Sequence, residues 1–263
     1  MVRLFKGMTT LSVLASIGIS VFLSFFLKES LFFFSVFGLS LLFFLLFNLI
    51  INKKFAKASN LLTQKLEVNE YAQSMLKILK IQSNKDAVNS MIHRTFCGFY
   101  YLGDAEMAKR LLDSVILPKL EYDEKNLNQL IMYYKDLAQY HLLIEDLDGA
   151  EMALLNMRSA IDADNTGSPT IEQLKFSYMS IDFLIKIHRG IFDGAEYFFK
   201  TRLLLCSTPL QRLEYSYNLA MLYYLQKRYD EAVSYFNFVI DNGKELYFTR
   251  KSMESLSKIK ASQ

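Results

Sequence analysis

The stretch Leu219–Val239, LAMLYYLQKRYDEAVSYFNFV, predicts two short helices joined by a tight turn. Small and apolar side chains recur at helical spacing and share one face in each half: Leu219, Ala220 and Tyr223 in the first, Ala232 and Phe236 in the second. The two alanines allow the helices to cross closely, while the larger rings fill the space around them. The stretch therefore predicts a helical hairpin.

The same pattern returns upstream with looser spacing. The small residues at equivalent places are Ser74, Ala108, Ala150, Ala195 and Ala232, so the copies are 34, 42, 45 and 37 residues apart. No long run alternates with a period of two, and the chain has only 10 Gly and 3 Pro to form turns. We therefore expect an all-α fold.

This spacing resembles the tetratricopeptide repeat, a hairpin of about 34 residues that stacks into an α-solenoid. The resemblance covers residues 53–243 and implies about four or five hairpins, with residues 244–263 as a C-terminal capping helix. The longer intervals depart from the family norm and imply extended helices or loops. The resemblance assigns packing between helices to Ala108, Leu137, Ala138, Ala150, Ala195, Leu219, Ala220, Tyr223, Ala232 and Phe236.

A stack of this kind has a concave face formed by the first helix of each hairpin, where members of the family bind peptides or protein segments. Its inward-facing positions correspond here to Tyr100, Tyr101, Lys135, Gln139, Tyr217, Met221 and Tyr224. Tyrosine suits such a groove because it offers a large contact area, few rotors and one polar group. The alternative is that these side chains only pack within the repeats.

Residues 1–52 have a different character. No charged residue occurs from Met8 to Leu27 or from Leu31 to Asn52. A helix of about 20 residues reaches about 30 Å, the thickness of the hydrocarbon core of a bilayer. We therefore expect two membrane spans, about residues 8–27 and 31–51, joined by a tight turn into a transmembrane hairpin. A cleaved signal peptide over the first stretch is the alternative.

Basic residues predict the orientation of this hairpin. Five flank it, Arg3 and Lys6 before and Lys53, Lys54 and Lys57 after, whereas the turn has one, Lys28. The positive-inside rule then places both termini in the cytoplasm and makes the chain a two-span protein of the cell membrane. The two cysteines, Cys97 and Cys206, agree with a reducing compartment because they are too few for a disulfide framework.

The first expected span carries a stripe of small residues. Ser12, Ser16, Ser20 and Ser24 recur every four residues, which allows close approach of another helix. That helix is either the second span of the same chain or part of another membrane protein. Since neither stretch contains an ionisable residue, no ion path or proton relay is expected.

The sequence contains no strong pattern of a metal-binding, catalytic or nucleic-acid-binding site. His93 and Cys97 have the spacing of two metal ligands, but no further ligand completes a site. Residues 162–167 begin like a calcium loop, yet Gln173 stands where a bidentate acid is required. A net charge of +3 does not indicate nucleic-acid binding. We expect no catalytic residues, metal, cofactor or nucleic-acid partner.

These features predict a membrane-anchored scaffold or adaptor whose cytosolic repeat domain binds a protein or peptide at the inner membrane surface. One alternative is a peptide-sensing regulator that passes a signal through its membrane hairpin. The other is an accessory subunit of a membrane enzyme or transporter. The concave groove is either open to a partner or filled by the chain's own C-terminal helix.

Overall fold

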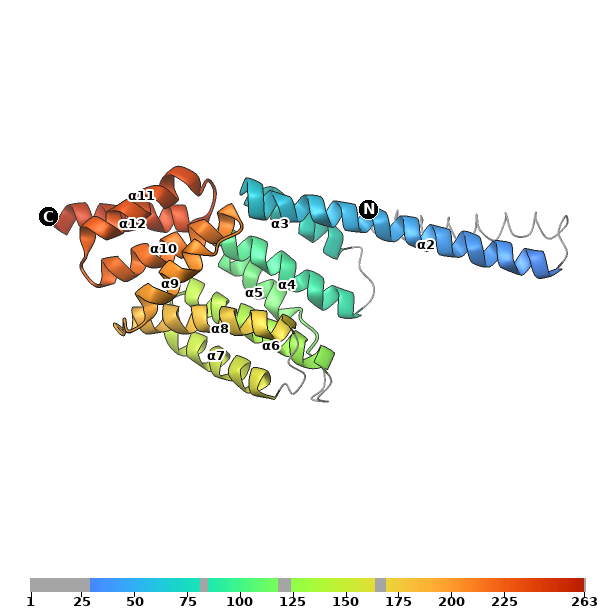
Figure 1. Cartoon of the computed structure of the whole chain (residues 1–263), viewed down its shortest axis with the longest axis horizontal. Coiled ribbons are helices and arrows are strands. Elements are labelled where there is room, and N and C mark those ends of the chain that lie inside the picture. Colours follow the sequence, from blue (N-terminus) through green and yellow to red (C-terminus); the bar gives the residue numbers. More distant parts are fainter. Residues whose placement is uncertain (1–28, 81–84, 118–123, 164–168, 263) are drawn as a thin grey trace. The chain divides into compact units, whose positions relative to one another are not determined.

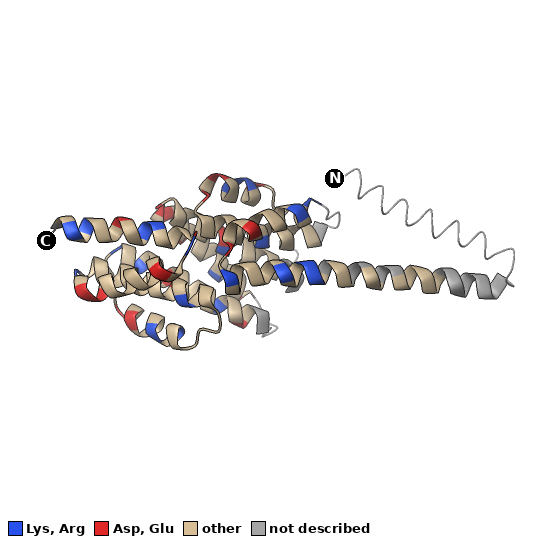
Figure 2. Ribbon diagram, turned by 90° about the horizontal axis from the view of Figure 1, so that it is seen from above, with Lys and Arg blue, Asp and Glu red and all other residues tan. Residues whose placement is uncertain are grey.

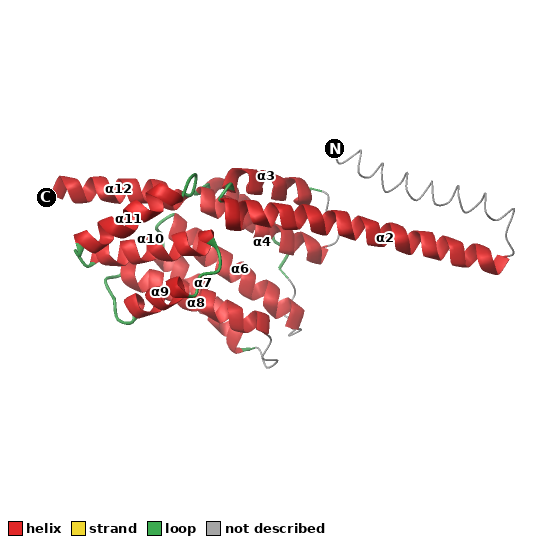
Figure 3. Cartoon of the chain, turned by 45° about the horizontal axis from the view of Figure 1, so that its top comes forward, coloured by secondary structure: helices red, strands yellow, loops and turns green. Residues whose placement is uncertain are grey.

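The computed structural model describes residues 29–80, 85–117, 124–163 and 169–262. Every regular element in these ranges is a helix (Figures 1 and 3), which confirms the predicted all-α class. The elements are α2 (Glu29–Asn60), the π-helix η1 (Leu61–Lys65), α3 (Val68–Leu79), α4 (Lys85–Leu102), α5 (Ala105–Asp113), α6 (Glu124–Leu143), α7 (Leu147–Asp162), α8 (Pro169–His188), α9 (Ala195–Leu204), α10 (Pro209–Leu225), α11 (Tyr229–Asn242) and α12 (Tyr247–Ser262).

The chain divides into two units, Met1–Ser59 and Asn60–Gln263. The described part of the first unit is α2. All of its described side chains between residues 37 and 50 are exposed, and most are large and apolar: Phe37, Leu39, Leu41, Leu42, Leu45, Leu46, Leu49 and Ile50. Figure 2 shows the change from uncharged to basic residues along this helix, where Lys53, Lys54 and Lys57 are exposed.

Among the described residues, none of the helices combines the length and the apolar character needed to cross a membrane. The first expected span, residues 8–27, lies outside the described residues, together with Ser12, Ser16, Ser20 and Ser24. Within the second expected span, the side chains of residues 31–36, 43–44, 47–48 and 51 also lie outside them. The described residues therefore do not support the predicted two-span hairpin.

In the second unit, helices that follow one another pack side by side (Figure 1): α3 on α4, α4 on α5, α6 on α7, α7 on α8, α9 on α10, α10 on α11 and α11 on α12. Side-chain caps fix where several helices begin. Thr208 accepts a hydrogen bond from the amide of Gln211 at 3.2 Å, directly before Pro209 opens α10. Asp104 and Asp146 cap α5 and α7 in the same manner, each through an amide at 3.0 Å.

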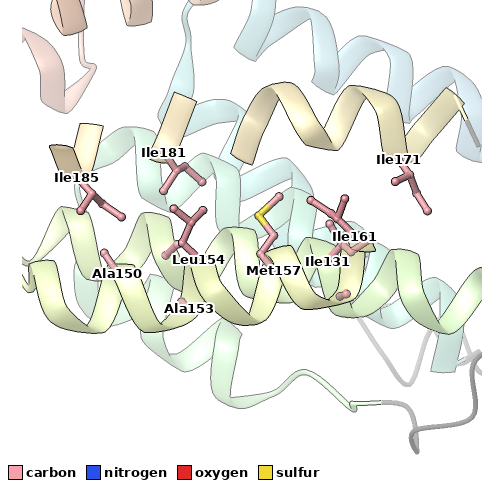
Figure 4. Packing of buried hydrophobic residues seen from close by; sticks show 11 residues of the cluster. Ile131, Ala150, Ala153, Leu154, Met157, Ile161, Ile171, Ile181 and Ile185 are labelled. Atoms are coloured by element: carbon pink, nitrogen blue, oxygen red, sulfur yellow. The ribbon is translucent and has the colours of Figure 1, made fainter. Parts of the chain in front are cut away.

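The core of this unit consists of apolar layers between neighbouring helices. In the layer of Figure 4, Ile181 of α8 lies over Leu154 of α7, and Ile185 lies over Ala150. Other layers join α3, α4 and α5, and join α9, α10 and α11. Of the residues assigned to packing, Leu137 is partly buried between two layers and the others are at most 1% exposed: Ala108, Ala138, Ala150, Ala195, Leu219, Ala220, Tyr223, Ala232 and Phe236.

The start and the end of the second unit lie near each other. Leu61 and Leu62 are buried and belong to the π-helix η1. This element packs on α10, and the ammonium of Lys244 donates a hydrogen bond to the carbonyl of Lys65 at 2.5 Å. Helix α12 also packs on α4 and α10, two of the helices whose inward faces the sequence predicts to be concave.

Candidate functional site

A pocket of about 360 Å³ lies on the face that the repeat pattern predicts to be concave. Its walls come mainly from α4, α6, α8 and α10, and η1, α3 and α9 contribute at the edges. Four predicted partner-binding residues line it together: Tyr100 and Tyr101 from α4, and Lys135 and Gln139 from α6. The volume is within the range of small-ligand sites, about 300–1,000 Å³.

The other three predicted partner-binding residues lie apart from this pocket. Tyr217, Met221 and Tyr224 of α10 are partly buried against the layer shared with α11 and α12. The ring of Tyr217 lies 4.8 Å from that of Phe248, and the ring of Tyr224 lies 6.4 Å from that of Phe236. The structure therefore places these side chains in contacts within the chain.

Helix α12 covers one end of the concave face. The hydroxyl of Tyr247 donates a hydrogen bond to the hydroxyl of Tyr100 at 3.3 Å. The ring of Phe248 lies 5.9 Å from the ring of Tyr101, and Arg250 Nη2 donates to the carbonyl of Leu102 at 2.9 Å. Part of the predicted groove is thus filled by the chain's own C-terminal helix, and the pocket is an open part of it among the described residues.

An acidic side chain that sequence reasoning missed lies in the pocket. The hydroxyl of Tyr101 donates a hydrogen bond to Glu214 Oε2 at 3.0 Å. Burial raises the pKa of Glu214, and this effect exceeds the opposing effects of Tyr101 and of the Lys135 charge. Glu214 continues the inward stripe of Tyr217 and Met221 by one turn toward the start of α10, so extending that stripe would have identified it.

The sequence reasoning also missed a cation at the pocket. The guanidinium of Arg202, on α9, lies over the ring of Phe176 at 4.8 Å and near the ring of Tyr215 at 5.7 Å. Arg202 Nε also donates a hydrogen bond to the hydroxyl of Tyr215 at 3.4 Å. Two aromatic side chains from different helices thus hold this charge in place.

The charge of Lys135 is paired behind the pocket wall. Its ammonium lies 3.3 Å from Asp136 Oδ1, and the other oxygen of Asp136 lies 2.5 Å from His93 Nδ1. Burial by itself lowers the pKa of Lys135, but the carboxylate of Asp136 leads the opposing effects and the net pKa is raised. For His93, burial exceeds the effect of Asp136 and lowers the pKa. Lys135 therefore stays charged, and His93 is predominantly neutral at pH 7.

The thiol in the pocket lacks the features of a nucleophile. Burial raises the pKa of Cys97 to about 11, so the reactive thiolate is scarce at neutral pH. The described residues contain no group of three His, Cys, Asp or Glu side chains that could hold a metal ion, and His93 bonds to Asp136. Residues 164–167 of the sequence that begins like a calcium loop lie outside the described residues.

No protein-family model matches the chain, and no curated protein or solved structure is significantly similar to it.

Proposed function

We propose that the chain is a membrane-anchored binding protein. Its apolar N-terminal segment holds it in the cell membrane as a two-span hairpin, and its second unit is a tetratricopeptide-like solenoid that binds a protein or peptide partner. The main support for binding is the pocket. Side chains from α4, α6, α8 and α10 line it together, as expected for a binding groove formed by several hairpins. Both termini and the solenoid lie in the cytoplasm in this proposal.

Support for the membrane anchor comes from residues 31–52. This stretch has no charged residue, lies within the continuous helix α2 and is followed by Lys53, Lys54 and Lys57. Its described large side chains are apolar and exposed around much of the helix circumference. A helix that is apolar all round needs an apolar environment, and the lipid bilayer is the one its length and its flanking lysines fit.

Support for binding in place of catalysis comes from the pocket chemistry. Cys97 is held as a neutral thiol, and the imidazole of His93 is bonded to Asp136 behind the wall. The lining also combines tyrosine rings with amide and hydroxyl groups, such as those of Gln139 and Ser177, and with charged side chains. Such groups recognise a ligand by contact and hydrogen bonding.

A second candidate function, the peptide-sensing regulator, has an observation in its favour. Helix α12 covers the end of the concave face at Tyr100 and Tyr101, and the cavity of about 360 Å³ holds only a short segment of chain. A short peptide or the end of a protein chain fits the pocket volume better. The adaptor and the regulator therefore differ in whether the occupant is attached to a larger partner.

Photo-crosslinking in intact membranes distinguishes the two. A photoreactive residue in place of Gln139, inside the pocket, should capture a specific partner, which mass spectrometry identifies as a protein or a peptide. The matched control places the same residue at Tyr197 of α9, which is 78% exposed, and should not capture it. Equal capture at both positions would refute the pocket as the binding site.

Membrane attachment and sidedness are tested separately. The full chain should stay in the membrane pellet during alkaline extraction. A Tyr197→Cys variant should react with a membrane-impermeant thiol reagent only after the cells are permeabilised, since residue 197 is well exposed. Release into the alkaline supernatant would contradict the anchor, and labelling in unbroken cells would contradict the orientation.

A further inference from the structure

Among the charged side chains that line the pocket, Glu214 and Arg202 have opposite charges, and neither has an ion-pair partner among the described residues. Glu214 of α10 accepts one hydrogen bond there, from Tyr101. Arg202 of α9 contacts the rings of Phe176 and Tyr215 and a tyrosine hydroxyl, and no acidic group in the described part of the chain pairs with it. Unpaired charges in a partly enclosed site are costly, since each loses part of its hydration.

The two charges do not neutralise each other. Arg202 Nε is bound to Tyr215, the residue that follows Glu214 on α10. Adjacent residues of an α-helix project about 100° apart, so the side chains of residues 214 and 215 leave α10 in different directions. Because two aromatic rings hold the guanidinium, the carboxylate and the guanidinium face the same cavity from separate places.

Resting on the proposed role of this pocket as a binding site, we propose that it binds a small zwitterion, an α-amino acid or a di- or tripeptide. The ammonium of the ligand lies on Glu214 and its carboxylate lies on Arg202. A guanidinium matches a carboxylate with two parallel hydrogen bonds, and a carboxylate accepts from an ammonium. The volume of about 360 Å³ is at the lower end of the range for small-ligand sites and limits the length of the ligand.

A ligand with both charges fits better than a simple cation or anion. A cation on Glu214 would leave Arg202 unpaired, and an anion on Arg202 would leave Glu214 unpaired. The two other cations of the lining do not remove this requirement, because the ammonium of Lys135 pairs with Asp136 and Arg94 has an interaction of its own. The amide of Gln139 and the hydroxyl of Ser180 line the same cavity and can bond to the peptide groups of the ligand.

The test uses the purified full chain in detergent micelles and affinity selection with mass-spectrometric readout. The probes are the free amino acids and a randomised tripeptide library in three forms: free termini, N-acetylated and C-amidated. We expect retention of members with both termini free and loss of the two capped forms. Retention of amino acids alone, or of tripeptides alone, identifies which zwitterion the pocket takes.

Variants connect binding to the two charges. Glu214→Gln and Arg202→Gln should each weaken binding of the selected probe about tenfold or more, because each removes one charged hydrogen bond. The matched controls Glu172→Gln and Arg158→Gln change exposed residues on α8 and α7 and should bind normally. Thermal melting verifies that all four variants are folded.

Retention of no probe, equal retention of capped and free probes, or normal binding by both pocket variants would overturn the inference. Its failure is separable from failure of the proposed function. If the photoreactive residue at position 139 still captures a protein while no zwitterion is retained, the binding site stands and the ligand class is wrong. If zwitterions are retained but alkaline extraction releases the chain, the ligand class stands and the anchor is wrong.

Discussion

Helix α8 separates two regions of the second unit that bury very different groups. On one side, Ile185 lies over Ala150 of α7 in a layer of apolar side chains (Figure 4). On the other side, Ser177 and Ser180 line a pocket that also contains charged side chains. One helix of 20 residues thus contributes side chains to both an apolar core and a polar cavity.

The difference separates stability from recognition. Burial of apolar area stabilises the layer between α7 and α8, by about 25 cal/mol for each Å² removed from water. The pocket destabilises the fold, because its charged groups lose hydration and do not regain all of that free energy from contacts within the chain. Substitutions in the layer should therefore change the free energy of unfolding strongly, and substitutions in the pocket should change it little or in the favourable direction.

The largest expected effect comes from a cavity in the apolar layer. Met157 is fully buried on α7, so Met157→Ala should lower the free energy of unfolding by about 2–5 kcal/mol. Met152 lies on the same helix and is 62% exposed, so the control Met152→Ala should change it by no more than about 0.5 kcal/mol. Urea unfolding of the full chain measures both. Equal losses would mean that this layer is not the main core.

The next effect concerns the turn that carries the contact between α4 and α12. Gly103 has φ +72°, and a Cβ there would lie 2.8 Å from the Cβ of Tyr247. Gly103→Ala should therefore lower the free energy of unfolding by about 1–3 kcal/mol and weaken the packing of α12 on α4. Gly190 has φ +79°, and no atom lies within 4 Å of where a Cβ would be. Gly190→Ala should therefore lower the free energy of unfolding only by the backbone strain, about 1 kcal/mol. Hydrogen exchange in α12 should rise in the first variant alone; equal exchange would contradict the proposed contact.

The sequence predicted helices and buried faces well where the information is local. Ala220 and Ala232 fall on the inner faces of their helices because the helical period is fixed by backbone geometry, and both are fully buried. The same period brought Tyr100 and Lys135 to one pocket, since both occupy first helices of their hairpins.

The place of Arg202 and the covered end of the groove depend on contacts between residues that are distant in the sequence. The ring of Phe248 stacks near Tyr217 because the chain returns along α10 after α11, and no periodic pattern reports which distant helix will pack there. Arg202 of α9 lies at the pocket in contact with the ring of Phe176, which belongs to another helix, α8. Such contacts depend on how helices that are distant in the sequence pack together, so the sequence pattern could not reveal them.

The pocket acid gives a prediction with a defined pH dependence. Since burial raises the pKa of Glu214, the folded state holds its proton more tightly than the unfolded state. The wild-type chain should therefore lose stability as the pH rises above about 4.5, through the raised pKa of the folded state. Glu214→Gln lacks this loss, so its stability relative to wild type should increase from acidic to neutral pH. Urea unfolding across this range measures the trend, and a decrease would contradict the burial of this charge.

The smallest effect comes from a glutamate on the surface, and its sign is opposite. Lys200 and Arg228 donate hydrogen bonds to Glu196 and, with Tyr223, lower its pKa to about 2. The folded state then favours the charged form, so this group adds stability above pH 4.5 that is lost as the pH falls toward 2. Glu196→Gln should reduce the free energy of unfolding at neutral pH by less than about 1 kcal/mol, because solvent screens these partly exposed pairs.

The two glutamates make the comparison decisive, because the substitution is the same at both places. Relative to wild type, Glu214→Gln should gain stability as the pH rises, whereas Glu196→Gln should lose it. High salt should reduce the effect at residue 196 and leave most of the effect at residue 214, since salt screens exposed charges more than enclosed ones. If both variants followed the same pH trend, Glu214 would behave as a surface acid, and the pocket would lose the unpaired charge that the proposed ligand requires.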